Sequence, residues 1–431
     1  MYRKIVRFFE DWKNNPHRKP LVVQGARQVG KTHSVLEFGR THYDNVAYFN
    51  FERNAKLKAT FDGDIGPDYL VPLLSHICGQ TIVKERTLIV FDEVQTCERA
   101  LTSLKYFCEE APQYHIIVAG SLLGVAVNRK EFSFPVGKVD MKTLYPMDME
   151  EFLIALGQEA LAMKIRECFN TDTPMPAALH DSAMMYYRQY LVVGGMPECV
   201  MQFAQTKDYL LVRNTQANIL ANYLDDMSKY NRQNEIKKAR LTYDNITVQL
   251  SKKNTRFQYK LIKKGGRAAE FENAIEGLAL SGIISQVYRV EHPRKPLDDN
   301  KDIDAFKIYV SDLGLLCAKK ELAAQDVLYM SDELAYFKGG MAENYVHVHL
   351  TINNYTAYYW ESERGAELDF VIQREGKVIP VEVKSADNTR AKSLNVYMET
   401  YKPPYAVKLS AKNFGFADGK KIVPLYAVFC I

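Results

Sequence analysis

The sequence predicts an α/β protein built from several domains, and three observations support this prediction. Short apolar runs alternate with helix-length segments over residues 1–155, which is typical of a mostly parallel sheet covered by helices on both faces. Near the C-terminus, two alternating runs separated by a turn indicate a β-hairpin. The chain has 431 residues, 47% of them hydrophobic and 25% charged, so it is an ordinary globular chain with material for several domains.

The first predicted element is an amphipathic helix. Ile5, Phe8, Phe9 and Trp12 recur at helical spacing with charged residues between them, unlike the apolar stretch of a signal peptide. No apolar run approaches the length of a membrane span, so we expect no membrane association. The seven cysteines are scattered, odd in number and contain no C-x-x-C pair, which argues against a disulfide framework or a zinc site and favours the cytoplasm.

Residues 1–155 are predicted to form one α/β domain. Its strands are expected in five short apolar runs, at 20–24, 45–51, 87–91, 115–119 and 138–144. The segments between these runs are long enough for crossover helices, which parallel neighbours require.

A glycine-rich motif of the form G-x-x-x-x-G-K-T follows the first strand, at residues 25–32. A loop of this kind turns its backbone N–H groups around a phosphate, and side chains at Gly25 or Gly30 would obstruct it. Lys31 is expected to reach the β- and γ-phosphates, and the Thr32 hydroxyl to ligate Mg²⁺. The alternative is a plain glycine turn before a helix, which the full match after a strand disfavours.

Two carboxylates follow the strand at 87–91. Asp92 is expected to hold Mg²⁺ through water, and Glu93 to polarise the water that attacks the γ-phosphate. The alternative is that both acids merely solvate a strand end. Ser121 follows the next strand and is a candidate sensor of the γ-phosphate. The predicted nucleotide contacts are Gly25, Ala26, Arg27, Gln28, Val29, Gly30, Lys31, Thr32, His33, Asp92 and Ser121, with Lys31 and Glu93 catalytic and Thr32 and Asp92 as metal ligands.

The two motifs favour ATP with Mg²⁺ and favour hydrolysis. A separate strand between the strands of the two motifs is typical of hydrolytic ATPases rather than small kinases. The guanine-recognition motif N-K-x-D is incomplete, because residues 300–303 end in isoleucine.

Residues 156–235 are predicted to form a helical lid or bridge, with breaks at 170–174 and 194–197 where proline and glycine interrupt the helical pattern. In residues 236–300, short helices precede a strand at 283–288 and a polar loop. Another strand follows at 305–310. Helices followed by two strands suggest a winged helix.

Positive charge is concentrated in residues 232–267, although the net charge of the whole chain is only +4. Two acids, Glu235 and Asp244, stand against eleven basic residues, so the segment is expected to contact duplex DNA without strong sequence preference. The alternative is a solvated helical face on a module that connects domains. The basic residues are Arg232, Lys237, Lys238, Arg240, Lys252, Lys253, Arg256, Lys260, Lys263, Lys264 and Arg267.

The predicted C-terminal hairpin carries a D…E-x-K pattern. Asp369 begins one strand, while Glu382 and Lys384 project from the same face of the next. In restriction-endonuclease-like folds this arrangement binds Mg²⁺ through the two carboxylates, and the lysine orients or activates water. Glu343, in the preceding helix, is a candidate further acid. The alternative is a set of alternating surface charges, and His347 and His349 are expected to be structural.

Motifs along most of the chain resemble those of bacterial and archaeal AAA-type ATPases that carry a C-terminal domain of unknown function. The resemblance implies an AAA-type P-loop ATPase domain at 1–155 and a restriction-endonuclease-like fold at 301–431. That family usually has Gly-Arg where this chain has Gly137-Lys138, so the role of that arginine does not carry over intact. Arg27, Arg99 and Arg129 are candidate substitutes. The motifs that carry the resemblance lie at 25–32, 91–95, 119–121, 144–152, 190–197, 309–315 and 359–385.

Three functions are compatible with these patterns. The first is an ATP-driven, DNA-associated enzyme with a nuclease-like C-terminal domain. The second is a nucleotide-dependent switch or scaffold whose C-terminal domain binds a protein and cuts nothing. The third, a small-molecule kinase, is disfavoured by the Asp92–Glu93 pair. A homo-oligomer and a protein partner both remain open.

Overall fold

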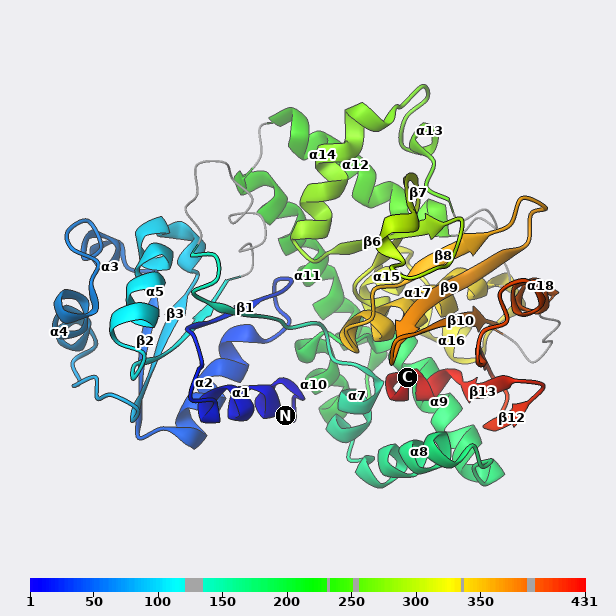
Figure 1. Ribbon diagram of the computed structural model, residues 1–431, viewed down its shortest axis with the longest axis horizontal. Helices are drawn as coiled ribbons and strands as arrows, with labels where there is room; N and C mark the ends of the chain where they lie inside the picture. Colours follow the sequence, from blue (N-terminus) through cyan, green and yellow to red (C-terminus); the bar gives the residue numbers. More distant parts are fainter. Residues whose placement is uncertain (121–134, 231–232, 251–255, 335–336, 386–391) are drawn as a thin grey trace. The chain divides into compact units, whose positions relative to one another are not determined.

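The computed structural model describes residues 1–120, 135–230, 233–250, 256–334, 337–385 and 392–431 (Figure 1). The chain folds into two compact units. The N-terminal unit comprises Arg3–Tyr145 with Leu280–Gly282, and the C-terminal unit comprises Met1–Tyr2, Pro146–Ala279 and Ile283–Ile431.

The N-terminal unit contains a five-stranded sheet in the order β2-β3-β4-β1-β5, and every strand pair in it is parallel. All five predicted strands are confirmed, and β4 lies between β1 and β3, the strands that carry the two motifs. The strands are β1 (Leu21–Gln24), β2 (Asn45–Asn50), β3 (Thr87–Asp92), β4 (His115–Ala119) and β5 (Asp140–Thr143). The helices are α1 (Ile5–Asn14), α2 (Lys31–His42), α3 (Ala55–Ala59), α4 (Pro67–Cys78), η1 (Val94–Thr96) and α5 (Glu98–Glu110).

Both faces of this sheet are covered, as the alternating apolar runs predict. Ile89 and Phe91 of β3 pack into a core with buried residues of α3, α4 and α5. The amphipathic helix α1 packs on α2, which contacts β2, β3 and β4; Phe9 and Phe38 meet there with ring centroids 5.2 Å apart. Figure 1 shows the helices of this unit around its strands. The strand ends that carry the motifs are therefore supported by helices packed on the sheet.

Helices fill the first part of the C-terminal unit, and the two predicted breaks are confirmed. The helices are α7 (Met149–Ala155), α8 (Glu159–Thr171), α9 (Ala177–Val193), α10 (Pro197–Thr206) and α11 (Tyr209–Tyr230). Glycine is required at the break after α9, because a Cβ at Gly194 would lie 2.3 Å from Asp312 Oδ1. Asp312 accepts the backbone N–H of Gly195 at 2.7 Å and caps the helix that begins at Leu313.

Three helices and two antiparallel strands follow in the order predicted for a winged helix. They are α12 (Gln233–Leu250), α13 (Tyr259–Ile262), α14 (Ala268–Leu280), β6 (Ile284–Val290) and β7 (Lys301–Val310), with the turn η2 (Asp298–Asn300) between the strands. On its β6 side the hairpin pairs in parallel with β8 of the C-terminal hairpin region, while β7 is an edge strand of the sheet. An unpaired strand edge is a liability, and this pairing covers one edge of the hairpin.

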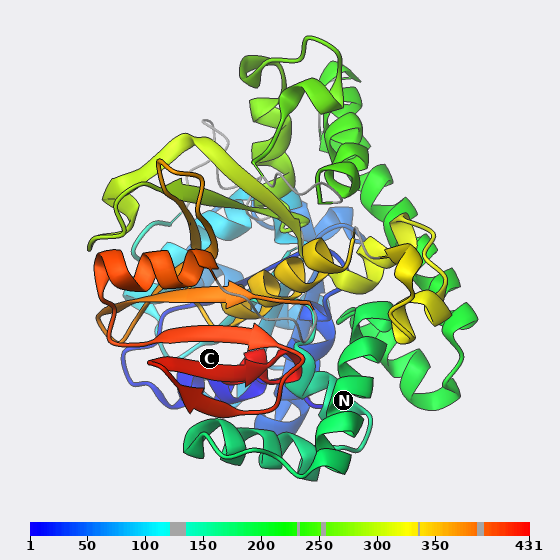
Figure 2. The same ribbon diagram turned by 90° about the vertical axis from the view of Figure 1, so that its right-hand side faces the viewer.

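A single eight-stranded sheet, β12-β13-β11-β10-β9-β8-β6-β7, therefore joins the predicted winged-helix strands to the C-terminal segment. In Figure 2 its last strands appear as neighbouring red and orange arrows. The predicted hairpin is confirmed as β9–β10, with positive φ at Glu375 and Gly376 in its turn. The remaining elements are α15 (Leu313–Lys319), α16 (Ala324–Leu328), η3 (Asp332–Leu334), α17 (Lys338–Ile352), β8 (Tyr358–Glu361), β9 (Glu367–Arg374), β10 (Lys377–Val383), α18 (Lys392–Tyr401), β11 (Ala406–Ser410), β12 (Gly415–Ala417), β13 (Lys420–Pro424) and η4 (Leu425–Cys430).

Two expectations about the whole chain can be compared with this fold. All seven cysteines are free thiols in the structure. Within the part of the chain that is described, no helix has both the length and the apolar character needed to cross a bilayer.

Candidate functional site

The glycine-rich loop connects β1 to α2 and needs glycine at both motif positions. Gly25 has φ +146°, and a Cβ there would lie 2.1 Å from the carbonyl oxygen of Leu144. Gly30 has φ +90° at the N-terminus of α2, a left-handed conformation that side chains disfavour. The loop thus begins and ends at positions where the backbone conformation excludes a side chain.

Lys31 lies across this loop. Its Nζ donates to the carbonyl oxygens of Gly25 and Ala26, at 2.9 and 2.8 Å. Burial lowers the pKa of Lys31 to about 8. An ammonium held over the loop by two carbonyls can exchange these acceptors for the oxygens of a bound phosphate, which is the role predicted for it.

Thr32 and Asp92 meet at the ends of α2 and β3. The Thr32 hydroxyl lies 3.1 and 3.2 Å from the two carboxylate oxygens of Asp92. Asp92 also accepts from the Tyr48 hydroxyl at 2.6 Å and from the Asn50 amide at 3.4 Å. A hydroxyl and a carboxylate side by side are oxygen ligands of the kind that Mg²⁺ takes, either directly or through water. The two predicted metal ligands are therefore adjacent and chemically suited to Mg²⁺.

Glu93 follows Asp92 in a left-handed conformation, with φ +50°. Its Oε2 accepts from the Gln95 side-chain amide at 2.5 Å. Burial raises the pKa of Glu93, and the neighbouring charge of Asp92 adds to this shift. A carboxylate with a raised pKa beside a phosphate loop is suited to accept a proton from water.

Sequence patterns missed Tyr48, Asn50 and Gln95. A signal for the first two exists, because β2 and β3 are parallel neighbours in which Asn50 pairs with Asp92. Polar residues at the carboxyl ends of adjacent parallel strands meet at one edge of the sheet. Gln95 gives no such signal, since its contact with Glu93 depends on the η1 turn.

The other predicted nucleotide contacts differ in their placement. Ala26 and Val29 are buried in the loop, and His33 is exposed on α2. Arg27 and Gln28 are half-buried in the loop. Ser121 and the candidate Arg129 lie outside the described residues.

The candidate Arg99, and Lys138 at the position of the family's arginine, are engaged elsewhere. Arg99 donates to the carbonyl oxygens of Phe61 and Gly63, in the latter case at 2.6 Å. Lys138 pairs with Glu109 at 2.8 Å. Both contacts fix the surface of the N-terminal unit.

The structure brings the D…E-x-K residues together at the C-terminal hairpin. Phe370 pairs with Val381, which sets Asp369 and Glu382 one step further along the two strands. Asp369 Oδ2 accepts the backbone N–H of Val383 at 2.7 Å. Lys384 Nζ forms an ion pair with Glu382 Oε1.

Glu382 is the most buried acid of this group, with 3% of its surface exposed. Its second oxygen, Oε2, is buried and has no hydrogen-bond partner among the described residues. Burial raises the pKa of Glu382 to about 7, and the nearby charge of Asp369 contributes. An orphaned carboxylate oxygen next to a second carboxylate fits a cation, so the residues present are suited to a divalent metal ion.

Two more acids border this pair. Glu343 of α17 accepts from the Tyr309 hydroxyl at 3.2 Å, and its pKa is raised to about 7 by burial. Glu367 of β9 pairs with Lys307 Nζ at 2.6 Å. We call Glu343, Glu367, Asp369 and Glu382, with Lys307 and Lys384, the acidic site. In the described part of the chain, no three His, Cys, Asp or Glu side chains converge in a way that could hold a metal ion.

The two histidines of α17 have structural contacts. His349 Nε2 accepts the backbone N–H of Met149 at 3.0 Å. His347 Nε2 lies 2.5 Å from the Ser285 hydroxyl.

Among the basic residues of this segment that the structure describes, all but Lys238 are exposed. Lys238 pairs with Glu235 and Lys263 with Glu270. Arg256 contacts the carbonyl oxygen of Asp304. Exposed cations that form no ion pair with another described residue are Lys237, Arg240, Lys260, Lys264 and Arg267. Arg232, Lys252 and Lys253 lie outside the described residues.

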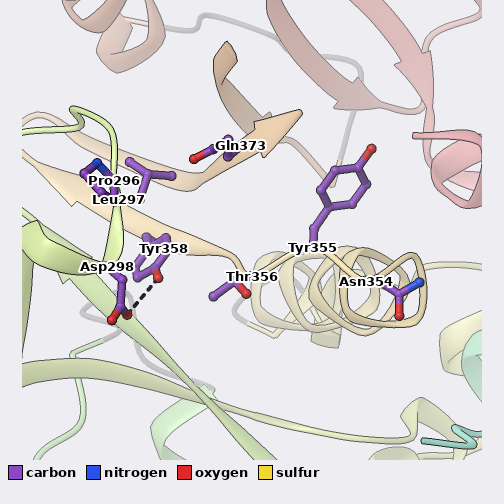
Figure 3. A pocket seen from close by; sticks show the side chains of 8 residues that line it. All are labelled: Pro296, Leu297, Asp298, Asn354, Tyr355, Thr356, Tyr358 and Gln373. Atoms are coloured by element: carbon purple, nitrogen blue, oxygen red, sulfur yellow. Dashed lines mark hydrogen bonds between the residues drawn. The ribbon is translucent and has the colours of Figure 1, made fainter. Parts of the chain in front are cut away.

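A pocket of about 300 Å³ lies between the loop after β6 and the end of α17 (Figure 3). In it, the Tyr358 hydroxyl donates to Asp298 Oδ1 at 3.0 Å. None of its lining residues belongs to the predicted sites. The lining residues are Pro296, Leu297, Asp298, Asn354, Tyr355, Thr356, Tyr358 and Gln373.

Models of known protein families match three segments of the chain. Residues 17–153 match a family model described as an AAA domain. The match contains both nucleotide motifs and supports an ATPase of the AAA type. Residues 184–326 and 338–428 match two models, each described as a domain of unknown function (DUF8612 and DUF4143). No curated protein sequence matches the chain significantly.

Solved structures resemble the chain only partly. A Walker-type ATPase of Pyrococcus abyssi is 13% identical, with a TM-score of 0.44, over 74% of this chain and 95% of that one. The ORC1 protein of Aeropyrum pernix, solved with DNA, is 11% identical, with a TM-score of 0.29, over 77% and 92%. The RuvB Holliday junction branch migration motor of Thermotoga maritima is 13% identical, with a TM-score of 0.30, over 66% and 89%.

Proposed function

We propose that this protein binds ATP with Mg²⁺ at the loop of residues 25–32 and hydrolyses it. The observation that carries the proposal is the contact of the Thr32 hydroxyl with both oxygens of Asp92, at 3.1 and 3.2 Å, beside a glycine loop spanned by Lys31. These contacts bring the parts of both motifs together at one edge of the sheet, as phosphoryl transfer requires.

Each residue then has a defined task. The loop N–H groups and Lys31 bind the phosphates, and Thr32 and Asp92 would hold the metal ion. When bound, Mg²⁺ neutralises charge on the phosphates. Glu93 accepts the proton of the attacking water, and its bond from Gln95 keeps the carboxylate oriented.

Ligand-induced stabilisation tests the binding step. At about 100 times its dissociation constant, Mg-ATP should stabilise the native state by about 2.7 kcal/mol, which raises the melting temperature of the N-terminal unit. Lys31→Ala should remove this shift, while Lys56→Ala, an exposed lysine of α3, serves as the matched control. A normal shift in Lys31→Ala would rule out the proposed phosphate site.

We also propose that the basic segment binds duplex DNA through phosphates. The supporting observation is that Lys260, Lys264 and Arg267 are exposed and form no ion pair with another described residue. Each phosphate contact contributes a slope of about −0.9 to the logarithm of affinity against the logarithm of salt concentration. The triple change of these residues to glutamate should therefore flatten the slope by two or more, roughly. No duplex binding at low salt would favour the switch or scaffold function.

We propose that Asp369 and Glu382 of the acidic site would hold a divalent metal ion, and that Lys384, which pairs with Glu382, would act there on water or on a scissile phosphodiester. The orphaned Oε2 of Glu382 supports this proposal. Glu382→Ala should abolish Mn²⁺ binding at this site, and with it any cleavage of DNA, while ATP hydrolysis continues. If calorimetry detects no Mn²⁺ at this site in the unmutated protein, the C-terminal domain is the non-catalytic module of the alternative function.

A further inference from the structure

Strand β7 brings a buried lysine into the acidic site. Lys307 has 1% of its surface exposed, and its Nζ lies 2.6 Å from Glu367 Oε1 and 3.7 Å from Glu343 Oε2. The ammonium also lies 4.9 Å from the centroid of the Tyr359 ring. Two residues on, the Tyr309 hydroxyl donates to the same oxygen of Glu343. A lysine is almost never fully buried unless it is paired, so these contacts explain its position.

Lys307 comes from a part of the chain distant from the D…E-x-K motif. It lies in β7, within the segment 184–326, whereas the four acids lie within 338–428. The eight-stranded sheet and α17 unite the two segments, because β6 pairs with both β7 and β8. The acidic site is therefore composite, and neither matched segment contains all of it.

The charges of the acidic site are unequal. Four carboxylates face two ammonium groups, Lys307 and Lys384, which leaves a formal charge of −2 when every group is ionised. The two lysines divide the acids between them: Lys307 contacts Glu343 and Glu367, and Lys384 contacts Glu382. The carboxylate of Asp369 and the unpartnered Oε2 of Glu382 are therefore the groups of the acidic site that can bind a further cation.

We propose that Lys307 is a positioning residue that limits the acidic site to a single divalent cation. It occupies Glu343 and Glu367 with a fixed charge, so one divalent ion at Asp369 and Glu382 neutralises the site. This inference rests on the metal site proposed above. It also makes the C-terminal segment alone an incomplete site.

Removing the charge of Lys307 should open room for a second ion. Lys307→Met keeps the length of the side chain and its apolar stem, and changes the formal charge of the acidic site from −2 to −3. The first Mn²⁺ should then bind about tenfold more tightly or better, because a nearby positive charge is gone, and a second Mn²⁺ should bind at Glu343 and Glu367. The double variant Lys307→Met/Glu367→Gln restores −2, and should return the stoichiometry to one.

Calorimetric titration of Mn²⁺ into the full chain measures these changes. Every sample carries Asp92→Asn, so that the nucleotide site does not contribute, and circular dichroism checks that each variant is folded. Lys301→Met is the matched control, since Lys301 lies in the same strand and forms its ion pair at the surface, with Asp298.

The outcomes are distinct. The inference is supported if the parent and the control each bind one Mn²⁺, Lys307→Met binds two ions or binds the first much more tightly, and the double variant binds one. A merely structural lysine would not be rescued by removing an acid. One Mn²⁺ of equal affinity in all four proteins overturns the role of Lys307 and leaves the metal site standing. No Mn²⁺ at the acidic site of the parent overturns both. If Lys307→Met fails to fold, the decisive sample is Glu367→Gln alone, which changes the formal charge of the site from −2 to −1. This variant should bind Mn²⁺ at least several-fold more weakly, and unchanged binding would contradict the inference.

Discussion

Replacing Gly25 by alanine should damage the phosphate loop far more than an ordinary glycine substitution. Alanine at a left-handed position costs about 1–2 kcal/mol, and the lower entropy of the unfolded chain offsets about 0.4–1 kcal/mol of this. Gly79, at φ +69° with open space around it, should show only that net cost. At Gly25 the new Cβ would in addition lie 2.1 Å from the carbonyl oxygen of Leu144.

The clash at Gly25 has no cheap relief. The atom that must move is backbone, and the N–H of the same Leu144 donates to Gln24 at 2.8 Å, which holds β5 against β1. We expect a loss of more than about 4 kcal/mol, a range reached only by mutations with a specific structural cause. For a unit of this size, that corresponds to a melting temperature lowered by about 8–16 °C, against a few degrees for Gly79→Ala.

Fluorescence of Trp12 measures this loss in the correct unit. The chain has two tryptophans, and Trp12 packs in the N-terminal unit with its ring 6.0 Å from that of His115. In a Trp360→Phe background the thermal transition of Trp12 reports this unit alone. Equal melting temperatures for Gly25→Ala and Gly79→Ala would refute the steric argument.

Three further predictions follow from single contacts. Burial lowers the pKa of His115 to about 4, so the unfolded state binds the proton first as pH falls. The free energy of unfolding should therefore drop between about pH 6.5 and 4, by up to about 1.4 kcal/mol per pH unit. His115→Asn should flatten this pH dependence of the stability measured by Trp12 fluorescence, and an unchanged slope would contradict the prediction. Asp312→Asn should destabilise the C-terminal unit by about 2–3 kcal/mol in denaturant titrations, because Asp312 accepts the N–H of Gly195 as a charged group; a change below 0.5 kcal/mol, roughly the surface norm, would speak against it. Tyr48→Phe removes the donor at 2.6 Å from Asp92, so Mg-ATP should bind about fivefold more weakly in equilibrium titrations, at about 1 kcal/mol per hydrogen bond, and equal affinity would exclude this role of Tyr48.

Patterns with local causes were predictable from the sequence. The five strands of the N-terminal sheet follow from short apolar runs, and the contact of Thr32 with Asp92 follows because each residue belongs to a motif with a known geometry. The β9–β10 hairpin follows from alternation and the turn at Glu375 and Gly376. In each case the information lies within a few residues of the feature.

Features that depend on distant pairing were not predictable. The pairing of β6 with β8 joins segments that look like separate modules, because strand edges carry no sequence label for their partner. Lys307 lies in an otherwise apolar stretch of β7, and only the folded sheet and α17 show that it meets Glu343 and Glu367. The isolation of Lys307 from any motif explains why the acidic site was predicted without it.

Steady-state ATP hydrolysis by the Glu93→Gln variant is the most direct test of the account. The change keeps the size of the side chain and removes the carboxylate that accepts a proton from water. Glu93→Gln should bind Mg-ATP as tightly as the unmutated protein, with the same thermal shift, and should lose turnover by two orders of magnitude or more, roughly the contribution of a general base. Turnover at the normal rate in Glu93→Gln, or no turnover in the unmutated protein with and without duplex DNA, would contradict the proposed ATP hydrolysis.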